Sequence, residues 1–227
     1  SIILFSKHAW QSAVPVLENL LRHTIRFEFT EITINILRTL RLYYGTMVGD
    51  YAQYEEIDLR LKKMEAIWGA ECKAENLYTD LVIRYVRSKA GKEAIAAKAG
   101  EYFEEIKPYM ADYSTYKLHF FGRLIETMIY DSRHDYAGMA MVCESAVAFF
   151  ENKDYQSASA LQGFYYNLLL CQLNLRHYAK CQSLANKYQI LYESGTFNWY
   201  KLQELYFLVA MHSGNYAEAS LIYAQTV

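Results

Sequence analysis

The chain has little of several residue types, and each shortage narrows the classes of protein to which it can belong. Its 227 residues include only two prolines and ten glycines, which favours long helices because both residues weaken a helix interior. No apolar run approaches the roughly 20 residues of a membrane span. The net charge of −2 supplies no basic excess for binding phosphates. We therefore expect no membrane span in this segment and no nucleic-acid partner.

Sequence motifs typical of disulfide frameworks, metal sites and catalytic sites are also scarce. The four cysteines, at positions 72, 143, 171 and 181, have no CxxC spacing, so we predict free, buried thiols. No His-Glu-x-x-His motif and no pair of histidines at i, i+4 occurs, and Gly91-Lys92 has no glycine five residues earlier. These observations predict no metal site, no cofactor and no catalytic residue, and hence a protein that is not an enzyme.

Apolar side chains, by contrast, are abundant. They make up 53% of the chain, which excludes a disordered polypeptide, and 22 residues are tyrosine. Tyrosine combines a large apolar ring with a polar hydroxyl, which suits the half-exposed seams between packed helices.

A short pattern occurs six times along the chain. It is an aromatic-Ala pair, or a variant of one, at the start of an apolar stretch, and successive copies are 38 to 43 residues apart. A fixed period in this range is typical of stacked helical hairpins. The copies begin at Trp10, Tyr51, Glu93, Tyr136, Tyr178 and Tyr216.

The residues around these anchors repeat as well. Two residues before each anchor lies a glycine, histidine or arginine, and glycine there would relieve a positive φ in a tight turn. The position six residues after each anchor is apolar, and so is the position ten residues after the first five anchors, which predicts one buried helix face. The preceding residues are His8, Gly49, Gly91, His134, Arg176 and Gly214. The following ones are Val16, Ile57, Ala99, Val142, Leu184 and Ile222, then Leu20, Leu61, Phe103, Ala146 and Tyr188.

The intervening segments fit as partner helices. They are predicted over about 28–47, 113–131, 157–174 and 198–212. The first has an apolar stripe that includes Phe29, Ile32, Ile36, Leu40, Tyr43 and Met47, and the third carries Leu161, Phe164, Tyr165, Leu168 and Leu169 as its core residues. We expect five hairpins after one unpaired helix at about 6–24, in a single all-α domain spanning residues 1–227. The start at Ser1 and the stop at Val227 inside an apparent helix suggest a fragment of a longer protein.

The segment Gly214-Asn215-Tyr216-Ala217-Glu218-Ala219 resembles the turn between the helices of tetratricopeptide repeats, where Gly-x-Tyr-x-x-Ala opens the second helix. Gly49-Asp50-Tyr51-Ala52 is similar, and the copies at Tyr136 and Tyr178 are partial. The chain departs from that family in three ways. Its period is near 41 instead of 34 residues, the proline that normally ends each repeat is missing, and the first helices lack the family's Trp-Leu-Gly-Tyr spacing. The resemblance implies a right-handed superhelix of antiparallel hairpins, an α-solenoid whose first helices line the concave side, and peptide or protein ligands.

Charged residues on the predicted first helices suggest one binding site. Arg38 and Arg41 lie 13 and 10 residues before their anchor, Tyr51. Arg123 lies 13 residues before Tyr136 and so occupies the same position as Arg38. Arg84 and Arg87 have the same spacing of three residues, about one helical turn closer to their anchor, Glu93. Stacking would align Arg38, Arg84 and Arg123 as a groove for acidic peptides, since guanidinium groups bind carboxylates in a fork geometry. Ordinary ion pairing with Asp80, Glu126 or Glu31 is the alternative. Four aromatic residues, Tyr43, Tyr85, Phe121 and Tyr166, are candidate stacking platforms in the same groove, or else pack between helices.

The function that these features favour is a protein- or peptide-binding scaffold that mediates protein–protein interaction through its concave face, with the cytoplasm as the expected location. Three other functions stay open: a ligand-sensing regulatory array, a fragment of an enzyme built as a toroid of α-hairpins, and an exported carbohydrate-binding scaffold. The toroid would need inward-facing Asp and Glu at helix ends, and no such set is evident in the sequence.

Overall fold

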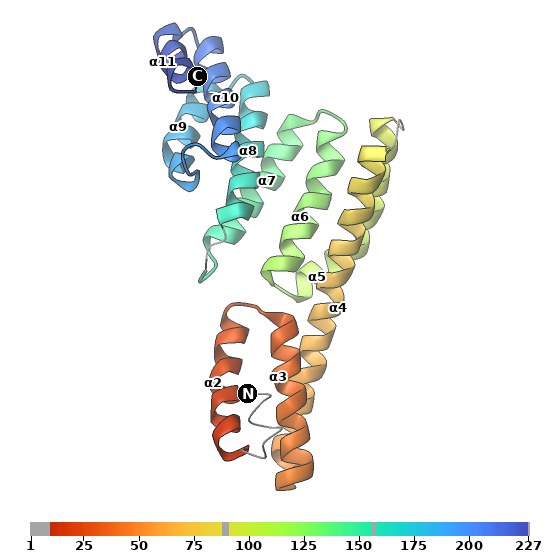
Figure 1. Ribbon diagram of the computed structural model, residues 1–227. Helices are drawn as coiled ribbons and strands as arrows, with labels where there is room; N and C mark the ends of the chain where they lie inside the picture. The colour runs from red at the N-terminus through yellow and green to blue at the C-terminus, as the bar shows by residue number, and fades with distance from the viewer. Residues whose placement is uncertain (1–9, 88–90, 156–157, 227) are drawn as a thin grey trace. The chain divides into compact units, whose positions relative to one another are not determined.

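A computed structural model describes residues 10–87, 91–155 and 158–226, and within these ranges helices joined by short turns form the chain (Figure 1). The described residues form ten α-helices, one π-helical turn and one 3-10 turn, and they include no β-strand. The prediction of an all-α protein is thereby confirmed. The elements are α2 Trp10–Arg26, α3 Thr30–Tyr43, η1 Tyr44–Val48, α4 Tyr51–Arg87, α5 Lys92–Asp112, α6 Tyr116–Asp131, α7 Tyr136–Glu151, α8 Ala158–Asn174, α9 Tyr178–Tyr188, η2 Gln189–Leu191, α10 Phe197–His212 and α11 Tyr216–Thr226.

The chain divides into two compact units. The N-terminal unit contains the residues up to Asn76 together with Pro108–Leu118, and the C-terminal unit contains Leu77–Lys107 and the residues from His119 onward. Neighbouring helices pack against each other within them, as α2 does on α3 and as α10 does on α11.

Helix α4 differs from the expected hairpin pattern. Its 37 residues form one continuous helix from Tyr51 to Arg87, where the repeat predicts the second helix of one hairpin and the first helix of the next. Neither proline nor a positive-φ glycine interrupts this range, so nothing local ends the helix. The two expected helices are therefore fused into one.

The repeated anchors mark helix starts, as predicted. Helices α4, α7, α9 and α11 begin at Tyr51, Tyr136, Tyr178 and Tyr216, and α5 begins at Lys92, one residue before its anchor. Trp10 is the first described residue of α2, and His8 lies outside the described residues.

The turns before three of these anchors share one hydrogen-bonding pattern. His134, Arg176 and Gly214 have φ of 55°, 60° and 78°. In each turn the N–H of this residue donates to the carbonyl three residues earlier, and the N–H of the next residue donates to the carbonyl five residues earlier. In the turn before α9, for example, Arg176 N–H donates to the Leu173 carbonyl at 3.0 Å, and His177 N–H donates to the Gln172 carbonyl at 2.9 Å. This is the Schellman motif, which ends a helix with a left-handed residue that is usually glycine.

The two earlier glycines behave differently from each other. Gly49 has a φ of 69° and follows the π-helical turn η1. Gly91 does not have a positive φ, so the expectation for that copy was wrong. Its carbonyl instead accepts the Ala94 N–H at 3.0 Å, which makes Gly91 the residue that opens α5.

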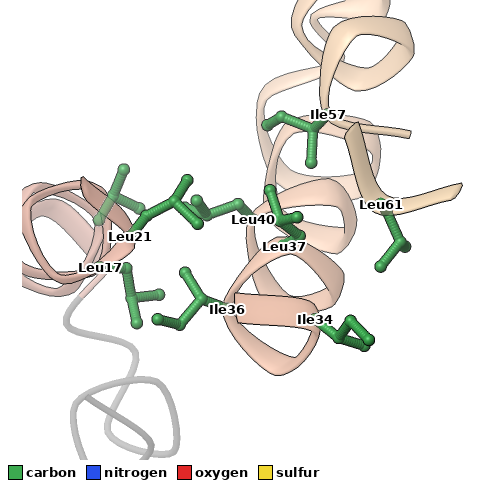
Figure 2. Packing of buried hydrophobic residues seen from close by; sticks show 9 residues of the cluster. Leu17, Leu21, Ile34, Ile36, Leu37, Leu40, Ile57 and Leu61 are labelled. Carbon is green, nitrogen blue, oxygen red and sulfur yellow. The ribbon is translucent and has the colours of Figure 1, made fainter. Parts of the chain in front are cut away.

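The core of the N-terminal unit lies between α2, α3 and α4. Figure 2 shows α3 between the other two helices, with Leu17 and Leu21 of α2 on one side and Ile57 and Leu61 of α4 on the other. The central Leu37 is fully buried. The predicted anchor-plus-six and anchor-plus-ten positions of α4, Ile57 and Leu61, are therefore confirmed as core residues.

Several predicted core residues of this unit are on the surface. In α2, Val16 is 51% and Leu20 is 41% exposed, while Val14, Leu17 and Leu21 are buried, so the register set from Trp10 was wrong. In and beside α3, the side chains of Phe29, Ile32 and Met47 are exposed as well. Because α3 packs against helices on two sides, its buried arc is wide and includes Ile34, Leu37 and even Thr33.

The C-terminal unit follows its predicted pattern more closely. All five predicted core residues of α8, namely Leu161, Phe164, Tyr165, Leu168 and Leu169, are buried. Three thiols are buried too, and burial raises the pKa of Cys171 to about 12 and that of Cys181 to about 11. All four cysteines are free, as predicted. Cys72, in the N-terminal unit, is only half-buried, so the prediction of burial was wrong for this one thiol. None of the described helices is both long and apolar enough to cross a membrane.

Candidate functional site

The predicted arginines of the N-terminal unit are engaged by carboxylates of the same unit. An Nη of Arg38 lies 2.7 Å from Glu65, and an Nη of Arg41 lies 2.7 Å from Asp58. Asp58 also accepts from Lys62, and these two cations lower the pKa of its carboxyl group, Lys62 first and Arg41 second. The pairs of Arg38 with Glu65 and of Arg41 with Asp58 join α3 to α4.

Two of the three predicted arginines of the C-terminal unit form ion pairs as well. Arg84 lies 2.6 Å from Asp80, four residues earlier on α4, and its hydrogen bond is the largest cause of the lowered pKa of Asp80. Arg123 lies 2.6 Å from Glu126 on α6. Arg87, at the end of α4, is exposed. Asp80 and Glu126 are the partners named by the alternative explanation of ordinary ion pairing.

The arginine groove therefore stays a prediction. Its row would join Arg38 of one unit to Arg84 and Arg123 of the other, and the arrangement within each unit does not decide that alignment. Surface ion pairs contribute only about 0–1 kcal/mol, so a ligand carboxylate could displace those formed by Arg38 and Arg84. Arg123 and Glu126 are less exposed and would be harder to separate.

The three predicted tyrosines occupy different environments. Tyr43 stacks on Trp10 with ring centroids 5.4 Å apart, so it serves the packing of α2 on α3. Tyr85 is 52% exposed on α4. Tyr166 is half-buried on α8, and it lines a pocket of the C-terminal unit.

That pocket lies between α8 and the start of α10. It has a volume of about 400 Å³ and combines aromatic rings with carboxamides, and none of its lining residues is acidic. Phe197, the first residue of α10, is 74% exposed beside it. The lining residues are Gln162, Gly163, Tyr166, Asn167, Tyr192, Phe197, Asn198 and Lys201.

A second hollow follows along the same two helices. It has a volume of about 660 Å³ and is lined by Leu170, Leu173, Asn174, Arg176, Tyr178, Leu208 and His212. On α8 the lining residues of both hollows succeed one another three or four positions apart, from Gly163 to Asn174, so they share one helix face. We call the two hollows together the α8–α10 groove.

Hydrogen bonds hold the first part of this groove in place. The Tyr192 hydroxyl donates to the Gln162 carbonyl at 2.6 Å, and the Gln162 side chain donates to the Leu191 carbonyl. The Asn198 amide in turn donates to the Gln162 side-chain oxygen at 3.2 Å. Burial raises the pKa of Tyr192, so its hydroxyl stays protonated and remains a donor. The Gln162 side chain is thereby oriented from two sides.

Sequence reasoning identified only Tyr166 among the lining residues. It missed Asn167, Asn198 and Lys201, although one local signal pointed to the first. Helix α8 has no charged residue, and Asn is a poor helix former, so an Asn in its interior suggests a role outside packing. No comparable signal marks Asn198, because its place beside Gln162 depends on the packing of α10 against α8.

The groove offers binding chemistry. Carboxamides both donate and accept hydrogen bonds, which suits a peptide backbone, and half-buried rings and leucines receive apolar side chains. Among the described residues no group of three or more His, Cys, Asp or Glu side chains is placed to hold a metal ion. No protein-family model matches this chain, and no curated protein matches it either.

Proposed function

We propose that this chain is a protein-interaction module that binds an extended peptide segment along the α8–α10 groove. The observation that carries the proposal is the lining of that groove, where Asn167 and Asn198 offer amides beside the rings of Tyr166 and Phe197. Extended peptides recognised in this way gain affinity from backbone hydrogen bonds and specificity from side-chain pockets.

The dimensions of the groove suit a short segment. From Gly163 to Asn174 helix α8 rises about 17 Å, at 1.5 Å per residue. An extended chain advances about 3.3 Å per residue, so the groove accommodates about five residues.

The tetratricopeptide resemblance supports the same location. In this proposal the hairpins form an α-solenoid whose first helices line the concave side, and α8 and α10 are first helices because each precedes an anchor. The three Schellman turns at His134, Arg176 and Gly214 support a repeating hairpin unit. A peptide on the α8–α10 groove would then lie on the concave face.

The test is a selection of random twelve-residue peptides, displayed on mRNA, against the whole chain. The affinity of the most enriched peptide is then measured by fluorescence anisotropy for the wild type, Asn167→Ala and Phe197→Ala. Each variant is expected to bind about tenfold more weakly, because one lost hydrogen bond or apolar contact is worth about 1.4 kcal/mol.

The control is Asn76→Ala, which removes an exposed asparagine from helix α4 and should leave the affinity unchanged. Circular dichroism confirms that all variants are folded. Failure to enrich any peptide, or equal binding by the wild type and both groove variants, would contradict the proposal.

A further inference from the structure

Arg176 occupies a backbone position that suits glycine. Its φ is 60°, and it ends α8 as the left-handed residue of a Schellman motif. The corresponding residue before α11 is Gly214, with a φ of 78°. A side chain other than glycine is strained in this conformation. The arginine at this position therefore costs some folding stability.

The surroundings of Arg176 indicate what it could bind. Its side chain lines the second hollow of the α8–α10 groove, whose floor consists of the half-buried Leu170, Leu173 and Leu208. In the part of the chain that the structure describes, Arg176 forms no ion pair, although Arg38, Arg41, Arg84 and Arg123 all do. Its charge is thus available to a ligand.

The second hollow contains further hydrogen-bond donors beside Arg176. His212 ends α10 and lines the same hollow, where its imidazole N–H is a hydrogen-bond donor. The Tyr178 ring lies parallel to the His212 ring, with centroids 6.3 Å apart, and carries a hydroxyl donor. None of the seven lining residues has a carboxylate. One arginine cation and several hydrogen-bond donors beside three leucines are complementary to a negative group attached to an apolar body.

We propose that the Arg176 end of the α8–α10 groove binds an acidic side chain of the peptide, next to an apolar side chain that packs on Leu170, Leu173 and Leu208. This inference rests on the proposed peptide-binding function and gives it a specificity. Arginine can take the carboxylate in a bidentate geometry, which distinguishes Asp or Glu from the isosteric amides.

The substitution Arg176→Gly separates binding from folding. It removes the guanidinium group and also the strained side chain, so the variant should bind less well yet melt about 2–4 °C higher. The matched control is His134→Gly, because His134 has a φ of 55° at the same position of the turn before α7 and does not line the groove. It should melt higher as well and retain binding.

The experiment uses the peptide most enriched on the wild-type chain and a counterpart with Asn for Asp and Gln for Glu. Fluorescence anisotropy should show that the wild type and His134→Gly bind the acidic peptide at least tenfold more tightly than its counterpart. This preference should disappear in Arg176→Gly. A preference that survives in Arg176→Gly, enriched peptides without an acidic residue, or a lower melting temperature for Arg176→Gly would overturn the inference.

The outcome also distinguishes this inference from the broader proposal. Peptides that depend on Asn167 but not on Arg176 would overturn the acidic specificity and leave peptide binding intact. Peptides that depend on neither residue would overturn both.

Discussion

At the scale of single residues, Glu71 of α4 shows how the N-terminal unit tolerates a charge in its interior. Its side chain is only 2% exposed and accepts a hydrogen bond from the Thr30 hydroxyl at 3.0 Å. Nearby, Lys117 pairs with Glu75 at 2.7 Å, and Glu28 accepts the backbone N–H of Tyr116. Burial raises the pKa of Glu71, and the bond from Thr30 and the charge of Lys117 offset this only in part.

The raised pKa predicts a pH-dependent stability. Because the carboxyl holds its proton more tightly in the folded than in the unfolded state, its contribution to stability falls as pH rises between the two pKa values. Glu71→Gln keeps an acceptor for Thr30 but cannot ionise. We expect the variant to be more stable than the wild type at pH 7, with a difference that shrinks as pH falls.

Urea denaturation at a series of pH values measures this difference. Glu104→Gln is the control, since Glu104 is exposed on α5 and should give a nearly constant difference from the wild type. A stability difference for Glu71→Gln that is independent of pH would show that Glu71 does not titrate in this range.

At the scale of elements, the turns before α7, α9 and α11 share one hydrogen-bonding pattern, although a different residue type has the positive φ in each. The left-handed residue is His134, Arg176 or Gly214, while the bonds that it and its successor donate are the same. The motif therefore tolerates a side chain, at a cost in backbone strain.

That cost can be measured at the glycine positions. Gly214→Ala should destabilise the protein by about 1 kcal/mol, because alanine is strained at a φ of 78° although no atom lies within 4 Å of its Cβ. At Gly91 a Cβ would also have no atom within 4 Å, and the φ is not positive, so Gly91→Ala should leave the stability unchanged or raise it slightly. Thermal melts of the two variants make the comparison, and equal melting temperatures would refute the assignment of strain.

At the scale of the whole molecule, each of the two units has its own core. Leu37 is fully buried among the helices of the N-terminal unit, and Leu205 is buried in a separate cluster of the C-terminal unit. A cavity in one core removes contacts from that core alone.

We expect Leu37→Ala to cost about 3 kcal/mol and to weaken the N-terminal unit selectively. Amide hydrogen exchange should accelerate in α2 and α3, with little change in α8 and α10. Leu205→Ala is the reciprocal variant and should accelerate exchange in α8 and α10. Uniform acceleration in both units by either variant would instead indicate one cooperative unit.

Helix starts and turns could be predicted from the sequence because they depend on neighbours within a few residues. The anchors at Tyr51, Tyr136, Tyr178 and Tyr216 begin helices. The buried face of α8 also followed from its own apolar spacing. The positive φ of Arg176 was not foreseen, since only glycine signals it clearly.

By itself, then, the amino-acid sequence determined an all-helical chain, the places where most helices begin, and the polar turns between them, all of which are governed by local backbone bonding. Only the tertiary structure decided which sides of α2 and α3 are buried, because that depends on which helices pack against them. It also brought Asn198 to Gln162 and placed Arg176 and His212 around one hollow, since residues this far apart in sequence meet only through packing.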